Sequence, residues 1–156
     1  MSTAVSPAKR VPIEAGFFTI PDDEKHSPQL LGSKCKKCGE VFFPRRQVCA
    51  KCLHRKTTDV LLSSTGTIYS YTYVHFPLFG GKREVKGYGV GQIDLPEGPR
   101  VQSILMGGPN DFKIGMKVTM ELETLKQNKE GQDVVIFRFR PVGATGRSPV
   151  QPIKNP

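Results

Sequence analysis

The chain has 156 residues, with 23 basic and 14 acidic side chains and a formal net charge of +9. This length allows one ordinary domain, or one small domain beside a mini-domain. The sequence has no run of about 18 apolar residues, which excludes a membrane-spanning helix, and its polar first ten residues lack the apolar segment of a secretory signal. We therefore expect a cytoplasmic protein without membrane association.

Residues 1–31 are expected to form an N-terminal arm. Its first fifteen residues are mostly polar and include two prolines, and Pro21 and Pro28 disfavour a long helix farther on. Phe17 and Phe18 are adjacent apolar residues in this otherwise polar stretch. They predict an extended or briefly helical arm that docks either on the protein's own core or on a partner.

The four cysteines of the chain form two pairs, Cys35-x-x-Cys38 and Cys49-x-x-Cys52. Four thiolates at the corners of a tetrahedron suit one structural zinc ion, with no open position for catalysis. Iron could occupy the same ligands, whereas two disulfides would need an oxidising compartment. Only ten residues separate the pairs, fewer than the roughly 15–20 of the usual spacing. We predict a compact zinc ribbon over residues 32–62, with a short strand at 41–43.

Most of the net charge lies in this ribbon. Between Ser33 and Lys56 there are eight basic residues and a single acid, Glu40, so the segment carries +7. Some of these cations offset the formal charge of −2 on a zinc ion with four thiolates. The rest, among them Arg45 and Arg46, could bind the phosphates of a cofactor or of a nucleic acid.

After Gly66 the pattern changes to alternation with a period of two, which is typical of strands. Turn residues rich in glycine and proline separate the strands, and five short strands without helical periodicity predict a Greek-key barrel of OB type over residues 63–142. The last residues, 143–156, are expected to form an extended tail. The predicted strands cover residues 67–74, 88–95, 100–106, 117–124 and 133–140.

The sequence offers no independent active site. Thiolysis needs a reactive thiolate, and the ribbon commits every cysteine to metal. The three histidines occur in unlike contexts, and there is no nucleophile elbow, P-loop or dinucleotide fingerprint. The competing class is single-stranded nucleic-acid binding, because alternation places Tyr69, Tyr71 and Tyr73 on one face of a strand, where they could stack bases. The cations are mostly in the ribbon, however, so nucleic acid is the less favoured partner.

The order of these motifs resembles the zinc-ribbon/OB-fold acyl-CoA-associated proteins. The resemblance covers roughly residues 30–142. It is carried by the two cysteine pairs with Gly39, Pro44 and Arg45, by residues 66–72 at the start of the barrel, and by residues 115–118 and 139–141. It implies a rubredoxin-like ribbon with one structural Zn²⁺, followed by an OB barrel. It also implies an accessory subunit of a hetero-oligomer whose catalytic partner is a thiolase-fold enzyme, or alternatively a hotdog-fold hydratase.

In such a complex the CoA thioester would be bound mainly by the partner. The loop after the first barrel strand, residues 77–87, combines apolar residues, a Gly-Gly pair and three cations. Loops of OB barrels are common binding sites. The residues expected to contact the CoA phosphates or the partner are Arg45 and Arg46 of the ribbon and Phe79, Lys82, Arg83 and Lys86 of this loop.

Overall fold

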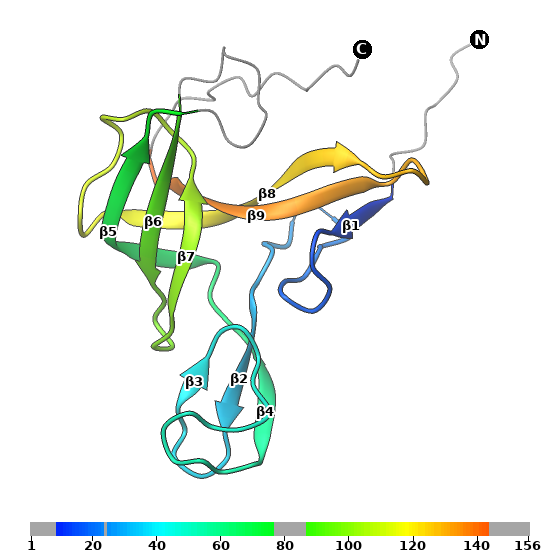
Figure 1. The fold of residues 1–156 in the computed structure, drawn as a ribbon, viewed down its shortest axis with the longest axis vertical. Helices are drawn as coiled ribbons and strands as arrows, with labels where there is room; N and C mark the ends of the chain where they lie inside the picture. Colours follow the sequence, from blue (N-terminus) through cyan, green and yellow to red (C-terminus); the bar gives the residue numbers. More distant parts are fainter. Residues whose placement is uncertain (1–8, 24, 77–86, 144–156) are drawn as a thin grey trace.

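The computed structural model describes residues 9–23, 25–76 and 87–143. These residues form strands and turns and contain no helix, so none is present that could span a membrane. A three-stranded ribbon projects from one end of a larger barrel (Figure 1), which confirms the predicted mostly-β fold. The strands are β1 (Arg10–Pro12), β2 (Leu31–Cys35), β3 (Val41–Phe42), β4 (Thr57–Leu61), β5 (Thr65–Val74), β6 (Tyr88–Asp94), β7 (Arg100–Leu105), β8 (Lys117–Gln127) and β9 (Asp133–Pro141).

The barrel is closed by five strands. β5, β6 and β7 form an antiparallel meander, β9 lies parallel to β7, and β8 pairs with both β9 and β5. This is the five-stranded Greek-key order of an OB barrel. The strands predicted from alternation match β5 to β9 to within a few residues at each end. Closure removes most of the free sheet edge that an open sheet would expose.

Glycines on β6 let the barrel interior close tightly. Gly89, Gly91 and Ile93 are buried at every second position of the strand. A Cβ added at Gly91 would lie 2.7 Å from Leu105 Cδ1, and one at Gly89 would lie 2.7 Å from Phe112 Cε2. Both Leu105 and Phe112 belong to the buried core. The large side chains of neighbouring segments therefore fill the space that β6 leaves open.

A β-bulge separates the three tyrosines that alternation places together. The β5–β6 register shifts between Ile68 and Ser70, so that Tyr69 has no partner of its own on β6. Tyr71 pairs with the buried Gly91 and packs edge-on against Phe112, so it lies on the Gly91 side of the sheet while staying 37% exposed. Tyr69 faces outward, where the Arg100 guanidinium stacks 3.3 Å from its ring centroid. The expectation of a single tyrosine face is therefore wrong.

The N-terminal arm packs on the protein's own barrel. β1 pairs in parallel with β9, from Arg10 opposite Asp133 to Pro12 opposite Val135. Phe18 is buried and packs edge-on against Phe137, with ring centroids 5.7 Å apart. The arm thus extends the barrel sheet by one short strand and adds an aromatic ring to the core. Sequence alone left open whether these phenylalanines dock internally or on a partner.

The ribbon sheet has the order β3-β2-β4, with both pairings antiparallel. Two segments connect it to the barrel, and their apolar residues Leu30 and Leu62 are fully buried in the common core. The Leu62 N–H donates to the Leu30 carbonyl over 2.9 Å. Next to this hydrogen bond, the Ser63 N–H donates to Glu97 Oε1 over 2.8 Å. The chain that returns from the ribbon is therefore bonded to the β6–β7 turn.

Candidate metal centre

Two similar tight turns, called knuckles here, present the four cysteines. In the first, residues 35–39, the Gly39 N–H donates to the Cys35 carbonyl, and in the second, residues 49–53, the Leu53 N–H donates to the Cys49 carbonyl, each over 3.0 Å. The fifth residue of each knuckle adopts a positive φ, 74° at Gly39 and 60° at Leu53. Glycine adopts this conformation without a steric cost, whereas leucine does not.

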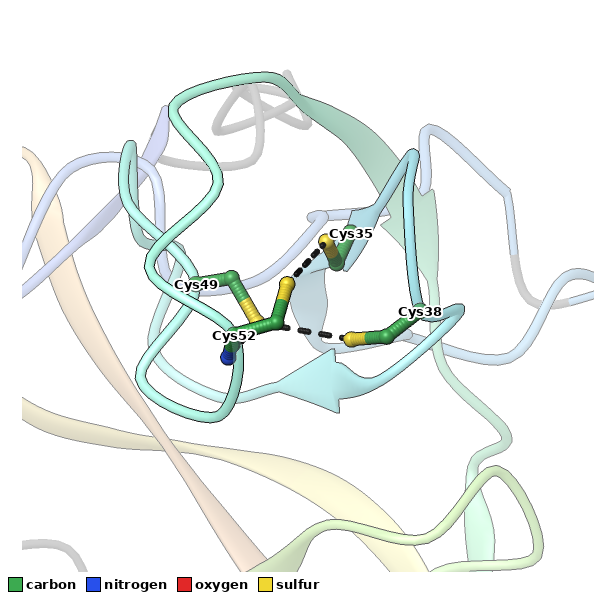
Figure 2. Close-up of side chains that lie close together, drawn as sticks. All are labelled: Cys35, Cys38, Cys49 and Cys52. Carbon is green, nitrogen blue, oxygen red and sulfur yellow. Dashed lines mark hydrogen bonds between the residues drawn. The ribbon is translucent and has the colours of Figure 1, made fainter.

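The sulfur atoms gather into one compact group, as Figure 2 shows. All four Sγ atoms lie within 4.8 Å of one another. Cys35 Sγ lies 3.6 Å from Cys52 Sγ, and Cys38 Sγ lies 3.6 Å from Cys49 Sγ. A tetrahedron with Zn–S distances of about 2.3 Å has S···S edges of about 3.8 Å. The four cysteines therefore fit a structural zinc ion that takes both ligand pairs.

Backbone N–H groups around the sulfurs favour thiolates. The Lys37 N–H lies 3.4 Å from Cys35 Sγ, and the Cys52 N–H lies 3.5 Å from Cys49 Sγ. The backbone N–H of Cys38 lowers the pKa of Cys35 more than burial raises it, and together with the Lys37 N–H and the thiols of Cys52 and Cys38 it brings this pKa to about 6. These donors reduce the cost of ionising sulfur in a mostly buried place.

At Cys38 the crowded sulfur atoms raise the thiol pKa, whereas the pKa of Cys35 is lowered. The N–H of Glu40 lowers the pKa of this thiol, but burial and the neighbouring sulfurs of Cys49, Cys52 and Cys35 raise it to about 12. Four negative charges at these separations repel one another strongly. A divalent cation at their centre removes this conflict, which is a further reason why the group suits a metal.

Two of the predicted contact residues take part in local interactions of the ribbon. Arg45 Nη1 pairs with Asp59 Oδ2 over 2.7 Å, and a Cβ added at Gly16 would lie 2.5 Å from Arg45 Nη2. Arg45 therefore links the N-terminal arm to β4. The Arg46 guanidinium lies 5.8 Å from the centroid of the Phe42 ring, and the backbone N–H of Arg46 donates to Ser33 Oγ over 2.8 Å. That either arginine contacts CoA stays a prediction.

The remaining predicted contacts, Phe79, Lys82, Arg83 and Lys86, lie outside the described residues. Sequence reasoning missed Ser33, whose fully buried hydroxyl accepts the Arg46 N–H and so fastens the loop between the knuckles to β2. A single serine in a short polar stretch gives no signal for this role. His54 is not part of the sulfur group. Its carbonyl accepts the Cys49 N–H.

Comparison with known proteins supports this architecture in both parts of the chain. Residues 23–58 match the family described as "ChsH2, rubredoxin-like zinc ribbon domain", and residues 59–123 match "ChsH2, C-terminal OB-fold domain". The chain is 33% identical over 116 residues to benzoylsuccinyl-CoA thiolase subunit BbsA of Thauera aromatica, covering 74% of this chain and 78% of that protein. It is 37% identical over 125 residues to a DUF35 domain-containing scaffold protein of Methanothermobacter thermautotrophicus, covering 75% and 92%.

Solved structures agree with this fold. The chain is similar to a structure titled "Ltp2-ChsH2(DUF35) aldolase", with a TM-score of 0.57 and 29% identity over 72% of this chain and 84% of that one. A DUF35-family protein of unknown function from Sulfolobus solfataricus shares the fold, with a TM-score of 0.51 and 22% identity over 72% and 75%. The chain therefore belongs to the ChsH2/DUF35 family, in which a rubredoxin-like zinc ribbon precedes an OB-fold domain.

Proposed function

We propose that the chain is a non-catalytic, zinc-binding subunit of an enzyme complex that processes acyl-CoA, with a thiolase-fold enzyme as its catalytic partner. The observation that carries the proposal is the convergence of all four cysteines of the chain on one site. Because four thiolates fill the coordination shell of zinc, no cysteine is left as a nucleophile for thiolysis. The carbon–carbon bond cleavage therefore takes place on the partner.

The names of relatives support an assembly of this kind. The Thauera aromatica relative, and a second one from Geobacter metallireducens that is 27% identical over 115 residues, are named as thiolase subunits. A structural relative is titled with two components, Ltp2 and ChsH2. By analogy, the chain stabilises a catalytic subunit and shapes the entrance through which the CoA thioester reaches it. The thioester is held mainly by that partner.

The proposal is tested by purifying the chain with whatever binds it in its native host and identifying the co-purified protein by mass spectrometry. CoA-dependent cleavage of acyl-CoA is then measured for the chain alone, for the isolated partner and for the recombined pair. We expect no turnover by the chain alone and full activity only on recombination. Turnover by the chain alone, or a recombined activity equal to that of the isolated partner, contradicts the accessory role.

The fold of the co-purified protein tests the second half of the proposal. A thiolase-fold enzyme supports it, whereas a hotdog-fold hydratase replaces the thiolase as partner and leaves the accessory role in place. A matched pair of ribbon variants separates a structural from a chemical contribution. Cys35→Ser should abolish recombination because the ribbon loses its metal, whereas Arg55→Ser, at an exposed position of the same ribbon, should retain zinc and recombine.

A further inference from the structure

The structure divides the basic residues of the ribbon into two groups. Arg45 pairs with Asp59, and Lys51 Nζ pairs with Glu40 Oε2 over 2.7 Å. The other six, Lys34, Lys36, Lys37, Arg46, Arg55 and Lys56, form no ion pair with any of the described residues. Three of them, Lys34, Lys36 and Lys37, lie within four consecutive residues. The single acid between Ser33 and Lys56 is therefore already occupied by Lys51, and these three lysines are grouped without a carboxylate.

The three lysines line one hollow of about 750 Å³ on the ribbon. Gly39, Thr58 and Val60 complete its wall, together with the first cysteine pair. Cys49 and Cys52 do not line it, so the hollow lies outside the cage formed by the four sulfurs. The hollow is shallow and open to solvent, so it can take a charged group at the surface without enclosing a whole ligand.

Local structure explains why these side chains share the hollow. Lys34 on β2 lies opposite Thr58 on β4, and Gly32 lies opposite Val60, so alternation puts the side chains of Lys34, Thr58 and Val60 on one face of the ribbon sheet. A Cβ added at Gly39 would lie 3.8 Å from Lys34 Cε, which places the lysine chain over the open backbone of the knuckle.

Hydrogen bonds fix the backbone at Lys36 and Lys37. The Lys36 N–H donates to the Lys56 carbonyl over 3.1 Å, and the Lys37 N–H lies 3.4 Å from Cys35 Sγ. Zinc with four thiolates contributes a formal −2, which offsets only part of the +7 carried between Ser33 and Lys56. The hollow therefore stays positive when the metal is bound.

We propose that this hollow binds a small organic phosphate. The ammonium groups of Lys34, Lys36 and Lys37 contact the phosphate oxygens, since a lysine ammonium is a compact donor suited to phosphate. Val60 and the backbone at Gly39 contact the uncharged part of the ligand. The ligand is either a free nucleoside phosphate or the phosphate end of a CoA thioester, and the inference does not depend on which enzyme is the partner.

The test uses the full, zinc-loaded chain and three probes: inorganic pyrophosphate, ADP and CoA. Binding is measured by calorimetry and by ¹⁵N amide shifts, at low salt and at about 0.15 M salt. We expect shifts centred on residues 34–39 and 58–60. Tighter binding of CoA than of ADP indicates the phosphate end of a CoA thioester, and equal binding indicates a free nucleoside phosphate. Either result supports the proposal.

Matched variants separate this site from general charge attraction. The triple change Lys34→Gln, Lys36→Gln and Lys37→Gln should raise Kd at least about tenfold. The same charge removed from the barrel, by Lys113→Gln, Lys126→Gln and Lys129→Gln, should leave Kd within about twofold. Zinc content and thermal midpoint show that both variants are folded.

Three results would overturn the proposal. The first is an equal loss of binding in the two triple variants, and the second is a set of shifts that maps elsewhere. The third is that none of the three probes binds at about millimolar concentration. Binding of an acidic polymer such as polyglutamate does not change this result.

Discussion

The ring of Phe43, in the ribbon, packs edge-on against the ring of Phe137, in the barrel, with centroids 6.1 Å apart and an interplanar angle of 87°. Phe17 of the N-terminal arm packs against Phe43 from another side at 5.8 Å. Three segments far apart in the sequence thus meet through one side chain. This contact, together with Leu30 and Leu62, joins the ribbon to the barrel.

Replacing Phe43 with alanine should therefore destabilise the joint between the two parts. The ring is partly buried, so we expect a loss of about 2–3 kcal/mol in the free energy of unfolding, measured by chemical denaturation. Phe76→Ala is the control, since that ring is 77% exposed and its loss should cost less than about 0.5 kcal/mol. Equal effects of the two changes would mean that Phe43 does not hold the joint.

Removing the metal should unfold the ribbon and spare the barrel. The ribbon sheet has only three short strands, and metal binding supplies much of the folding free energy in domains of this size. After treatment with a chelator, or in Cys35→Ser, amides of residues 31–61 should lose hydrogen-exchange protection, while buried barrel residues such as Ile93 and Val118 retain it. Metal analysis of the purified chain should find one zinc ion. The absence of both zinc and iron would refute the metal centre.

The two knuckles differ at one position, which offers a direct substitution test. Leu53 has φ 60° and a 75% exposed side chain, so Leu53→Gly relieves strain and sacrifices little packing. We expect a gain of up to about 1 kcal/mol, seen as zinc retention at a higher chelator concentration and as a raised thermal midpoint. Gly39→Ala is the reverse change and should cost about 1 kcal/mol. A loss of stability in Leu53→Gly would show that the exposed leucine makes a contact that matters.

The close approach of β5 to β6 should make Gly66 sensitive to a single added methyl group. A Cβ there would lie 2.5 Å from Ile93 Cγ2 and 3.0 Å from the Asp94 carbonyl oxygen. We expect Gly66→Ala to lower the free energy of unfolding by about 1–3 kcal/mol in denaturant titrations. In Gly108→Ala, where the nearest atom is 3.4 Å away, the change should be near zero. A neutral Gly66→Ala would indicate that the barrel relaxes at this corner.

The barrel strands could be predicted because the residue pattern of each strand matches its burial in the structure. β5 to β9 alternate apolar and polar residues between clear turns, and each has one face in the core. β2 and β4 were missed as strands. Their sequences, Leu-Gly-Ser-Lys-Cys and Thr-Thr-Asp-Val-Leu, contain few strand-favouring apolar residues, and pairing with each other compensates for this.

What sequence reasoning could not supply depends on contacts distant along the chain. The bulge between Ile68 and Ser70 leaves Tyr69 without a partner on β6, and no pattern within β5 reveals this. Likewise, Phe18 packs on Phe137 near the far end of the chain. The cysteine spacing was enough to predict the metal centre because both pairs are local motifs. Which ribbon cations form ion pairs could not be predicted, because it depends on where Asp59 and Glu40 lie in the fold.

The chain leaves the barrel at Leu30 and returns at Leu62, and these two residues are hydrogen-bonded neighbours inside the core. Everything between them is thus an insertion with adjoining ends, fastened to the barrel a second time by Phe43 on Phe137. Such an insertion can be shortened, lengthened or exchanged without moving the barrel, provided that it keeps an aromatic contact at this place. The zinc-bearing segment can therefore diverge to suit a new neighbour while the barrel keeps its shape.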